Sequence, residues 1–129
     1  MNREEINQLS DQVVGALIEV HKHLGPGLLE SVYEAAFCHE LTLRGLSFER
    51  QLAVPVEYKG VKLESAFRLD VLVKGEIIVE LKAVAQMLPV FEAQAISHLK
   101  LLNKPLAYLA NFHVKLMKDG IKRFANFPS

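Results

Sequence analysis

The sequence has one cysteine, no net charge and no long apolar run, and each shortage narrows what the protein can be. Cys38 has no second cysteine to pair with, so no intrachain disulfide can form and a reducing compartment is favoured. The 15 basic and 15 acidic residues cancel, which argues against a protein that coats nucleic acid by bulk electrostatics. No apolar run approaches the ~18 residues of a membrane-spanning helix.

Targeting and linker signals are also scarce. Residues 1–5 do not begin the basic and then apolar pattern of a signal peptide, and no repeat, low-complexity tract or linker follows. A chain of 129 residues, half of them apolar and 23% charged, has the length of one domain and can bury a core. We therefore expect a single cytoplasmic domain over residues 1–129.

The periodicity of apolar residues predicts three helices and five strands. Helices are expected over residues 3–24, 29–41 and 89–102, and strands over 47–58, 61–73, 77–84, 106–112 and 121–127. The pair Asn2 and Glu5 resembles a capping box at the first helix, and Pro55 indicates that the first strand is an edge strand or carries a bulge. The order of elements predicts an α/β sandwich, in which helices flank a mixed sheet.

The stretch from Phe67 to Lys82 organises the rest of the chain. Its odd-numbered positions are apolar, apart from the glycine at 75, and its even-numbered positions include Arg68, Asp70, Glu80 and Lys82. Strand side chains alternate between faces, so Glu80 and Lys82 share one face. An odd number of turn residues would add Asp70 to that face and keep all the odd-numbered apolar side chains on the other. Two carboxylates on one face suit a hard divalent cation. The alternative is an ordinary solvent-facing sheet surface.

Several other residues invite a functional interpretation that their surroundings weaken. Cys38 lies among apolar residues, which indicates a core residue rather than a nucleophile. His21 and His23 are two apart in a predicted helix, so we expect surface histidines rather than a metal-binding pair. Glu30 lies in a first helical turn, where an acid complements the helix dipole. His98 is expected on a polar helix flank.

Asp70 followed by Glu80-Leu81-Lys82 resembles the D…(D/E)xK signature of the PD-(D/E)XK nuclease superfamily. Upstream, Gly27-Leu28-Leu29-Glu30-Ser31-Val32-Tyr33 is similar to the GxxExxY motif of one bacterial and archaeal branch. Gln94 lies on a predicted helix where several branches carry a glutamine, and Asn111-Phe112 resembles the branch's ending of the next strand. His98 is a departure, because related nucleases often have a tyrosine there.

The resemblance implies a restriction-endonuclease-like fold and metal-dependent hydrolysis of phosphodiester bonds in nucleic acid. Asp70 and Glu80 would bind Mg²⁺ or Mn²⁺, with the Leu81 carbonyl as a further candidate ligand. Lys82 would orient the attacking water or stabilise the charge on the phosphate. Glu30 and Gln94 would support the site from the flanking helices.

Two other classes of function stay open. One is a catalytically inactive member of the same fold that acts as a binding or regulatory module, and another is a structural homodimer that uses the sheet edge or the first helix. Residues 98–129 hold six Lys or Arg against Asp119 alone, a surplus that would suit a phosphate backbone or a solvated surface equally well. The sequence does not distinguish DNA from RNA as the substrate.

Overall fold

The computed structural model describes residues 1–128, apart from the side chains of Ser65 and Ala66. Its elements are α1 (Arg3–Leu24), α2 (Glu30–Leu43), β1 (Phe48–Tyr58), β2 (Val61–Val73), β3 (Ile77–Lys82), α3 (Pro89–Leu102), β4 (Leu106–Asn111), η1 (Met117–Asp119) and β5 (Ile121–Ala125). The predicted order of helices and strands is confirmed, and a short 3-10 helix, η1, lies in addition between β4 and β5.

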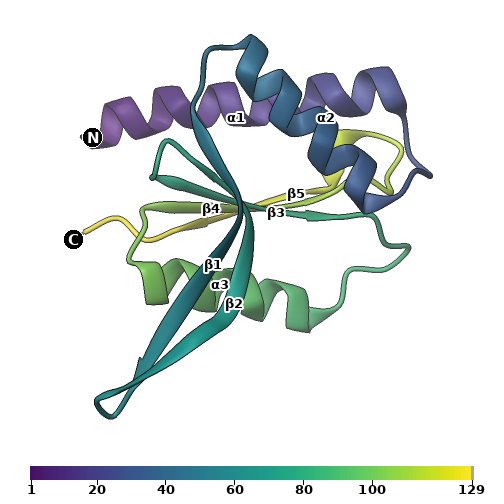
Figure 1. The fold of residues 1–129 in the computed structure, drawn as a ribbon. Coiled ribbons are helices and arrows are strands. Elements are labelled where there is room, and N and C mark those ends of the chain that lie inside the picture. Colours follow the sequence, from purple (N-terminus) through teal and green to yellow (C-terminus); the bar gives the residue numbers. More distant parts are fainter. Residues whose placement is uncertain (129) are drawn as a thin grey trace.

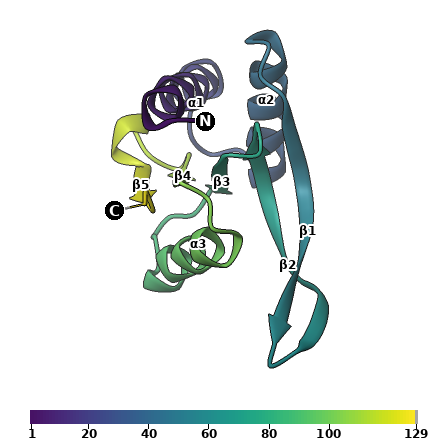
Figure 2. The same ribbon diagram turned by 90° about the vertical axis from the view of Figure 1, so that its left-hand side faces the viewer.

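The five strands form one mixed sheet in the order β1-β2-β3-β4-β5. All neighbours are antiparallel except β3 and β4, which are parallel and are connected by α3. Helices α1 and α2 cover one face and α3 covers the other (Figures 1 and 2). The expected α/β architecture, a mixed sheet flanked by helices, is therefore confirmed.

The prediction that all odd-numbered apolar side chains of the β2–β3 pair share one face is wrong. Val71 packs in the larger core cluster with α1 and α2, whereas Phe67 and Leu69 pack in the smaller cluster with α3. Even-numbered Leu72 and Ile78 also belong to the α3 cluster. Helices cover both faces of the central sheet, so apolar side chains are needed on both faces. The long strand β2 also twists along its length, so the alternation of apolar and polar residues holds for only part of the strand.

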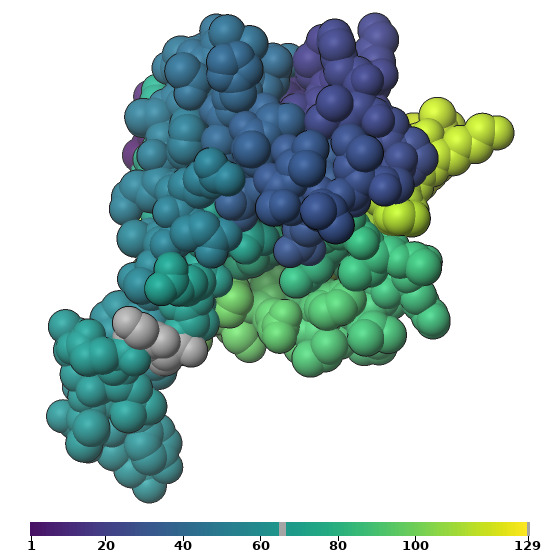
Figure 3. All heavy atoms as spheres, turned by 45° about the vertical axis from the view of Figure 1, so that its right-hand side comes forward, coloured from purple at the N-terminus to yellow at the C-terminus, as the bar shows by residue number. Residues whose placement is uncertain are grey.

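The hairpin of β1 and β2 extends beyond the helices as an arm (Figures 1 and 3). β1 is an edge strand, and its register with β2 shifts between Val54 and Val56. Both features confirm the interpretation of Pro55. Tyr58, near the tip of the arm, is 61% exposed.

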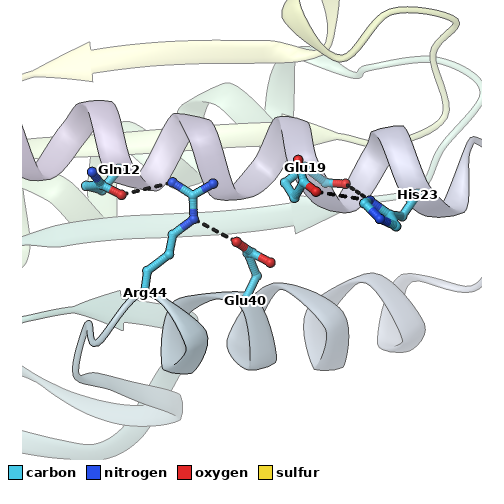
Figure 4. Close-up of polar contacts among 5 residues, drawn as sticks. All are labelled: Gln12, Glu19, His23, Glu40 and Arg44. Atoms are coloured by element: carbon cyan, nitrogen blue, oxygen red, sulfur yellow. Dashed lines mark hydrogen bonds and ion pairs between the residues drawn. The ribbon is translucent and has the colours of Figure 1, made fainter.

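Helices α1 and α2 are joined by a polar bridge from Arg44, which follows α2. Its Nε donates to Glu40 Oε2 at 2.7 Å and its Nη1 donates to Gln12 Oε1 on α1 at 2.9 Å (Figure 4). A Cβ on Gly15 would lie 2.9 Å from that Nη1. Because Gly15 has no side chain, the Arg44 guanidinium can lie against α1 at this position.

The two histidines of α1 have different surroundings. His21 is buried, and its Nε2 donates to the Val114 carbonyl at 2.8 Å, so the prediction of a surface residue is wrong. The segment after β4 covers the last turn of α1, a contact that helix spacing cannot reveal. His23 is exposed as predicted, and its Nδ1 lies 3.2 Å from Glu19 Oε1 (Figure 4).

Cys38 is a buried core residue, as predicted. Burial raises the pKa of its thiol to about 11. Since the thiolate is the nucleophilic form, this residue is inert at neutral pH.

Candidate active site

The candidate site lies where β2 and β3 separate. The last ladder pair on this side joins Val71 to Val79, and Asp70 and Glu80 are each the next residue along. Beyond that pair, the Asp70 side chain takes the place of a backbone acceptor, because its Oδ2 accepts a hydrogen bond from the Leu81 N–H at 2.8 Å. The turn that follows Val73 and precedes Ile77 has the odd length that the sequence argument required.

Glu80 is held by a histidine from the opposite helix. Its side chain is nearly buried, and its Oε1 lies 2.8 Å from His98 Nδ1 on α3. The His98 ring stacks on Phe67 of β2, with 4.2 Å between ring centroids and 6° between planes. His98 thus belongs to the site, whereas the sequence indicated only a polar flank. The feature of the sequence that could have indicated this is the spacing of His98 four residues after Gln94, which places both on one face of the helix.

Lys82 ends β3 and points toward α3. Its Nζ lies 4.7 Å from the centroid of the Phe91 ring, a cation–π contact. Its carbonyl accepts from the Phe112 N–H at 2.9 Å, and it pairs with Asn111 across the parallel strands. The ammonium group and the Glu80 carboxylate therefore start from the same face of β3, two residues apart.

Asn111 fixes the chain that leaves the site. This buried amide accepts from the N–H of Val84 and of His113, each at 3.1 Å, and donates to the Val84 carbonyl at 3.0 Å. These bonds replace strand pairing after Lys82, which explains why β3 ends two residues before the predicted boundary. The sequence motif Asn111-Phe112 thus has a structural role at the end of β4.

Asp70 is the residue of the site whose pKa is shifted most clearly. Burial is the largest cause that raises the pKa of its carboxyl from 3.8 to about 6, and the negative charges of Glu80, Glu34 and Glu30 add to the rise. The hydrogen bond from Leu81 opposes it. A partly buried carboxylate with other carboxylates nearby is stabilised in its charged form by a bound cation.

Glu34 is an acidic residue near the site that the sequence argument missed. It lies one helical turn after Glu30 and is nearly buried. Its two oxygens accept from Arg50 Nε at 2.8 Å and from Gln51 Nε2 at 2.6 Å. Gln51 has a φ of 52°, a left-handed conformation on β1. Because both oxygens are engaged, Glu34 connects α2 to β1 and raises the pKa of Asp70 at a distance.

The two supporting residues expected from the helices lie on opposite faces of the sheet. Glu30 begins α2 and Gln94 lies on α3, and both are exposed. Within residues 1–128, neither makes a hydrogen bond or ion pair with Asp70, Glu80 or Lys82. Glu30 and Gln94 could therefore reach a ligand at the candidate site only from opposite faces of the sheet.

A divalent cation fits the donor set at this edge only in part. No group of three or more His, Cys, Asp or Glu side chains is arranged to hold a metal ion in the described part of the chain. Mg²⁺, however, is commonly bound through one or two carboxylates plus waters and substrate phosphates. Asp70 and Glu80 are such a pair, and the pKa of Asp70 is raised chiefly by burial and further by the negative charge of Glu80, which a cation would neutralise.

No helix within residues 1–128 has the length and apolar character needed to cross a membrane.

Comparison with known proteins agrees with this geometry. The family described as the PD-(D/E)XK nuclease superfamily matches residues 7–124, nearly the whole chain. Curated proteins and solved structures give no significant match. The matched range includes both carboxylates, the lysine, strands β1 to β4 and all of β5 but its last residue, and the α/β arrangement agrees with a restriction-endonuclease-like fold. The chain belongs to the PD-(D/E)XK nuclease superfamily.

Proposed function

We propose that the protein is a metal-dependent nuclease that hydrolyses phosphodiester bonds in nucleic acid. The observation that carries the proposal is the joint placement of Asp70 and Glu80 at the point where β2 and β3 separate. Family membership supports a nuclease-like function, and members of this superfamily generally use divalent metals. We also assign the chain to the GxxExxY branch, on Gly27, Glu30 and Tyr33, and place it in the cytoplasm, on its single cysteine.

Each site residue has a distinct task in the proposed reaction. Asp70 and Glu80 would hold Mg²⁺ or Mn²⁺, with the Leu81 carbonyl as a further ligand. A cation held by these residues would supply Lewis-acid chemistry, polarising the phosphate and lowering the pKa of a bound water. Lys82 would move its ammonium group from Phe91 toward the scissile phosphate and stabilise the negative charge that grows on it.

The residues on the helices act on those groups or on the substrate. His98 would orient the Glu80 carboxylate through its ring N–H, because a hydrogen bond to one oxygen fixes the direction of the other. Glu30 would contribute negative charge or bind the metal through water, and Gln94 would contact substrate from α3.

The contacts that hold Glu80 and Lys82 also favour a second function. Both side chains are engaged by α3, through His98 and Phe91, and both are at least half-buried. A site whose glutamate and lysine already have partners within the protein suits a catalytically inactive module that binds or regulates without cleaving. A homodimer is compatible with either function.

A cleavage assay separates the two functions. The purified protein is incubated with single- and double-stranded DNA and RNA oligonucleotides, with Mn²⁺, with Mg²⁺ and with EDTA. A nuclease cleaves at least one substrate when a metal is present and none in EDTA. If wild-type protein cleaves none of them, the inactive module becomes the better description. If cleavage persists in EDTA, the proposed metal dependence is wrong.

A further inference from the structure

Two adjoining hollows lie at the end of the molecule where β3 leads into α3. The larger, of about 540 Å³, is lined by Lys22 of α1, Pro26 and the segment from Lys115 to Lys118. The smaller, of about 410 Å³, shares Pro26 and Lys115 and adds His113. In Figure 1 the end of α1, the loop into α2 and the segment between β4 and β5 come together on the right-hand side.

The charge of these hollows is of one sign. Lys22, Lys115 and Lys118 line them, and no acidic residue does. Among the described residues, none of the three lysines takes part in an ion pair. The nearest acids along the chain are Asp119 and Glu19, and Glu19 pairs with His23.

The loop that lines the smaller hollow begins directly after the strand end that lies beside Lys82. Phe112 donates its N–H to the Lys82 carbonyl at 2.9 Å, and His113, which lines the smaller hollow, is the next residue. The Phe112 ring stacks on Tyr33 of α2 with 4.3 Å between centroids. Phe112 therefore contacts both the end of β3 at Lys82 and α2 at Tyr33, directly before the loop that lines the smaller hollow.

We propose that these hollows form a lysine groove, defined by Lys22, Lys115 and Lys118, that binds the phosphate groups of a nucleic-acid strand next to the segment cleaved at Asp70 and Glu80. This inference rests on the proposed function and adds a binding site for the part of the substrate that lies next to the cleaved bond. Lysine binds phosphate as a point charge. Three lysines spread over two adjoining hollows suit a repeating polyanion better than a single small anion.

The floor of the groove fits a strand rather than bare phosphate. Ile18 is 42% exposed and Leu116 is 51% exposed, and both line the larger hollow. Apolar side chains there can contact sugar and base while the lysines hold the backbone. The same floor would suit an acidic peptide with apolar residues, and the experiment below distinguishes that ligand.

The test is a binding titration in EDTA, which prevents metal-dependent cleavage. Fluorescence anisotropy measures the affinity of wild type for labelled DNA and RNA oligonucleotides over a series of salt concentrations. The variant carries Lys22→Ala, Lys115→Ala and Lys118→Ala. The matched control carries Lys62→Ala, Lys100→Ala and Lys104→Ala, which remove the same charge from the arm and from the α3 side of the molecule.

We expect the groove variant to lose about tenfold or more in affinity, and its salt slope to fall by roughly two to three, because each phosphate contact contributes about 0.7 to 0.9. The control should keep the wild-type slope. An unchanged slope in the groove variant, or an equal loss in the control, overturns the proposal and leaves the groove to a ligand such as an acidic peptide. The exposed single variant Lys115→Ala, with an expected slope change of about one, decides the matter if the triple variant does not fold.

The experiments can contradict the proposal of the lysine groove and the proposal of nuclease activity independently of each other. Wild type that binds with a lysine-dependent salt slope but never cleaves keeps the groove and contradicts the nuclease. Wild type that cleaves, while the groove variant binds normally, keeps the nuclease and overturns the groove. Wild type that binds no oligonucleotide contradicts both.

Discussion

Asp70 and Leu81 are joined across the separating ends of β2 and β3 by a hydrogen bond of 2.8 Å from the Leu81 N–H to Asp70 Oδ2. Leu81 lies between Glu80 and Lys82, whose side chains leave the opposite face of the strand. One bond therefore sets the position of the Asp70 carboxylate relative to both. It also partly offsets the cost of burying that carboxylate next to other acids.

Replacing Asp70 by Asn should stabilise the metal-free protein at neutral pH. The folded pKa of about 6 lies above 3.8, so the neutral carboxyl stabilises the fold below about pH 4 and this contribution is lost as the pH rises through 6. Asn keeps an acceptor for the Leu81 N–H without the charge. We expect a gain on the order of 2–3 kcal/mol in the free energy of unfolding at pH 7.5, from the size of the pKa shift.

The measurement is urea unfolding of both proteins at pH 4 and pH 7.5 in EDTA. The gain should disappear at pH 4, where Asp70 is already protonated in the folded state. Asp11→Asn, an exposed acid on α1, is the matched control and should show no such pH dependence. Equal stability of Asp70→Asn and wild type at both pH values would contradict the charge argument.

Removing His98 should weaken metal binding. His98→Ala leaves Glu80 Oε1 without its partner, and loss of a hydrogen bond that orients a ligand typically costs 10–100-fold in metal affinity. Calorimetric titration with Mn²⁺ measures the change, and His98→Gln should recover part of it because the amide can donate. His39→Ala, on the exposed side of α2, is the control. An unchanged affinity for Mn²⁺ in His98→Ala would show that Glu80 does not need the histidine.

Lys82→Ala should remove cleavage and keep the fold. The side chain is only half-buried and contacts Phe91, so its loss leaves the core intact, whereas losing a charge-stabilising group commonly costs about 10²–10³ in rate. The assay is single-turnover cleavage with Mn²⁺, with unfolding temperature as the check on folding. Lys100→Ala on α3 is the control. Undiminished cleavage by Lys82→Ala would point to a contaminating nuclease.

Asn111→Ala should destabilise the whole end of the sheet that carries the site. It leaves the N–H and carbonyl of Val84 and the N–H of His113 without their partner. We expect a loss of roughly 2–3 kcal/mol in the free energy of unfolding, because buried groups left unpaired cost about 1–3 kcal/mol each and water can satisfy some. Asn126→Ala, which loses one bond to the Lys104 carbonyl, should cost less. A similar loss in both variants would contradict the proposed role of Asn111.

Local patterns in the sequence were sufficient for the elements and for the two carboxylates. The bounds of α1 and β2 follow from apolar periodicity, the capping box of Asn2 and Glu5 forms as predicted, and β2 and β3 pair in the expected register. These features depend on residues close together in the chain, whose spacing is visible in the sequence. The positions of Asp70, Glu80 and Lys82 also follow from this spacing, and the resemblance to the PD-(D/E)XK signature made them the candidate site residues.

What surrounds those carboxylates was decided by tertiary structure. Glu34 is bound by residues 16 and 17 positions later, and His98 reaches Glu80 across 18. His21 is buried by Val114, 93 residues away, and the lysine groove joins Lys22 to Lys115. No periodicity connects such pairs, because their distance depends on how the helices pack on the two faces of the sheet. The sequence by itself determined the fold and the candidate site residues, and packing determined the burial, partners and charge that act on them.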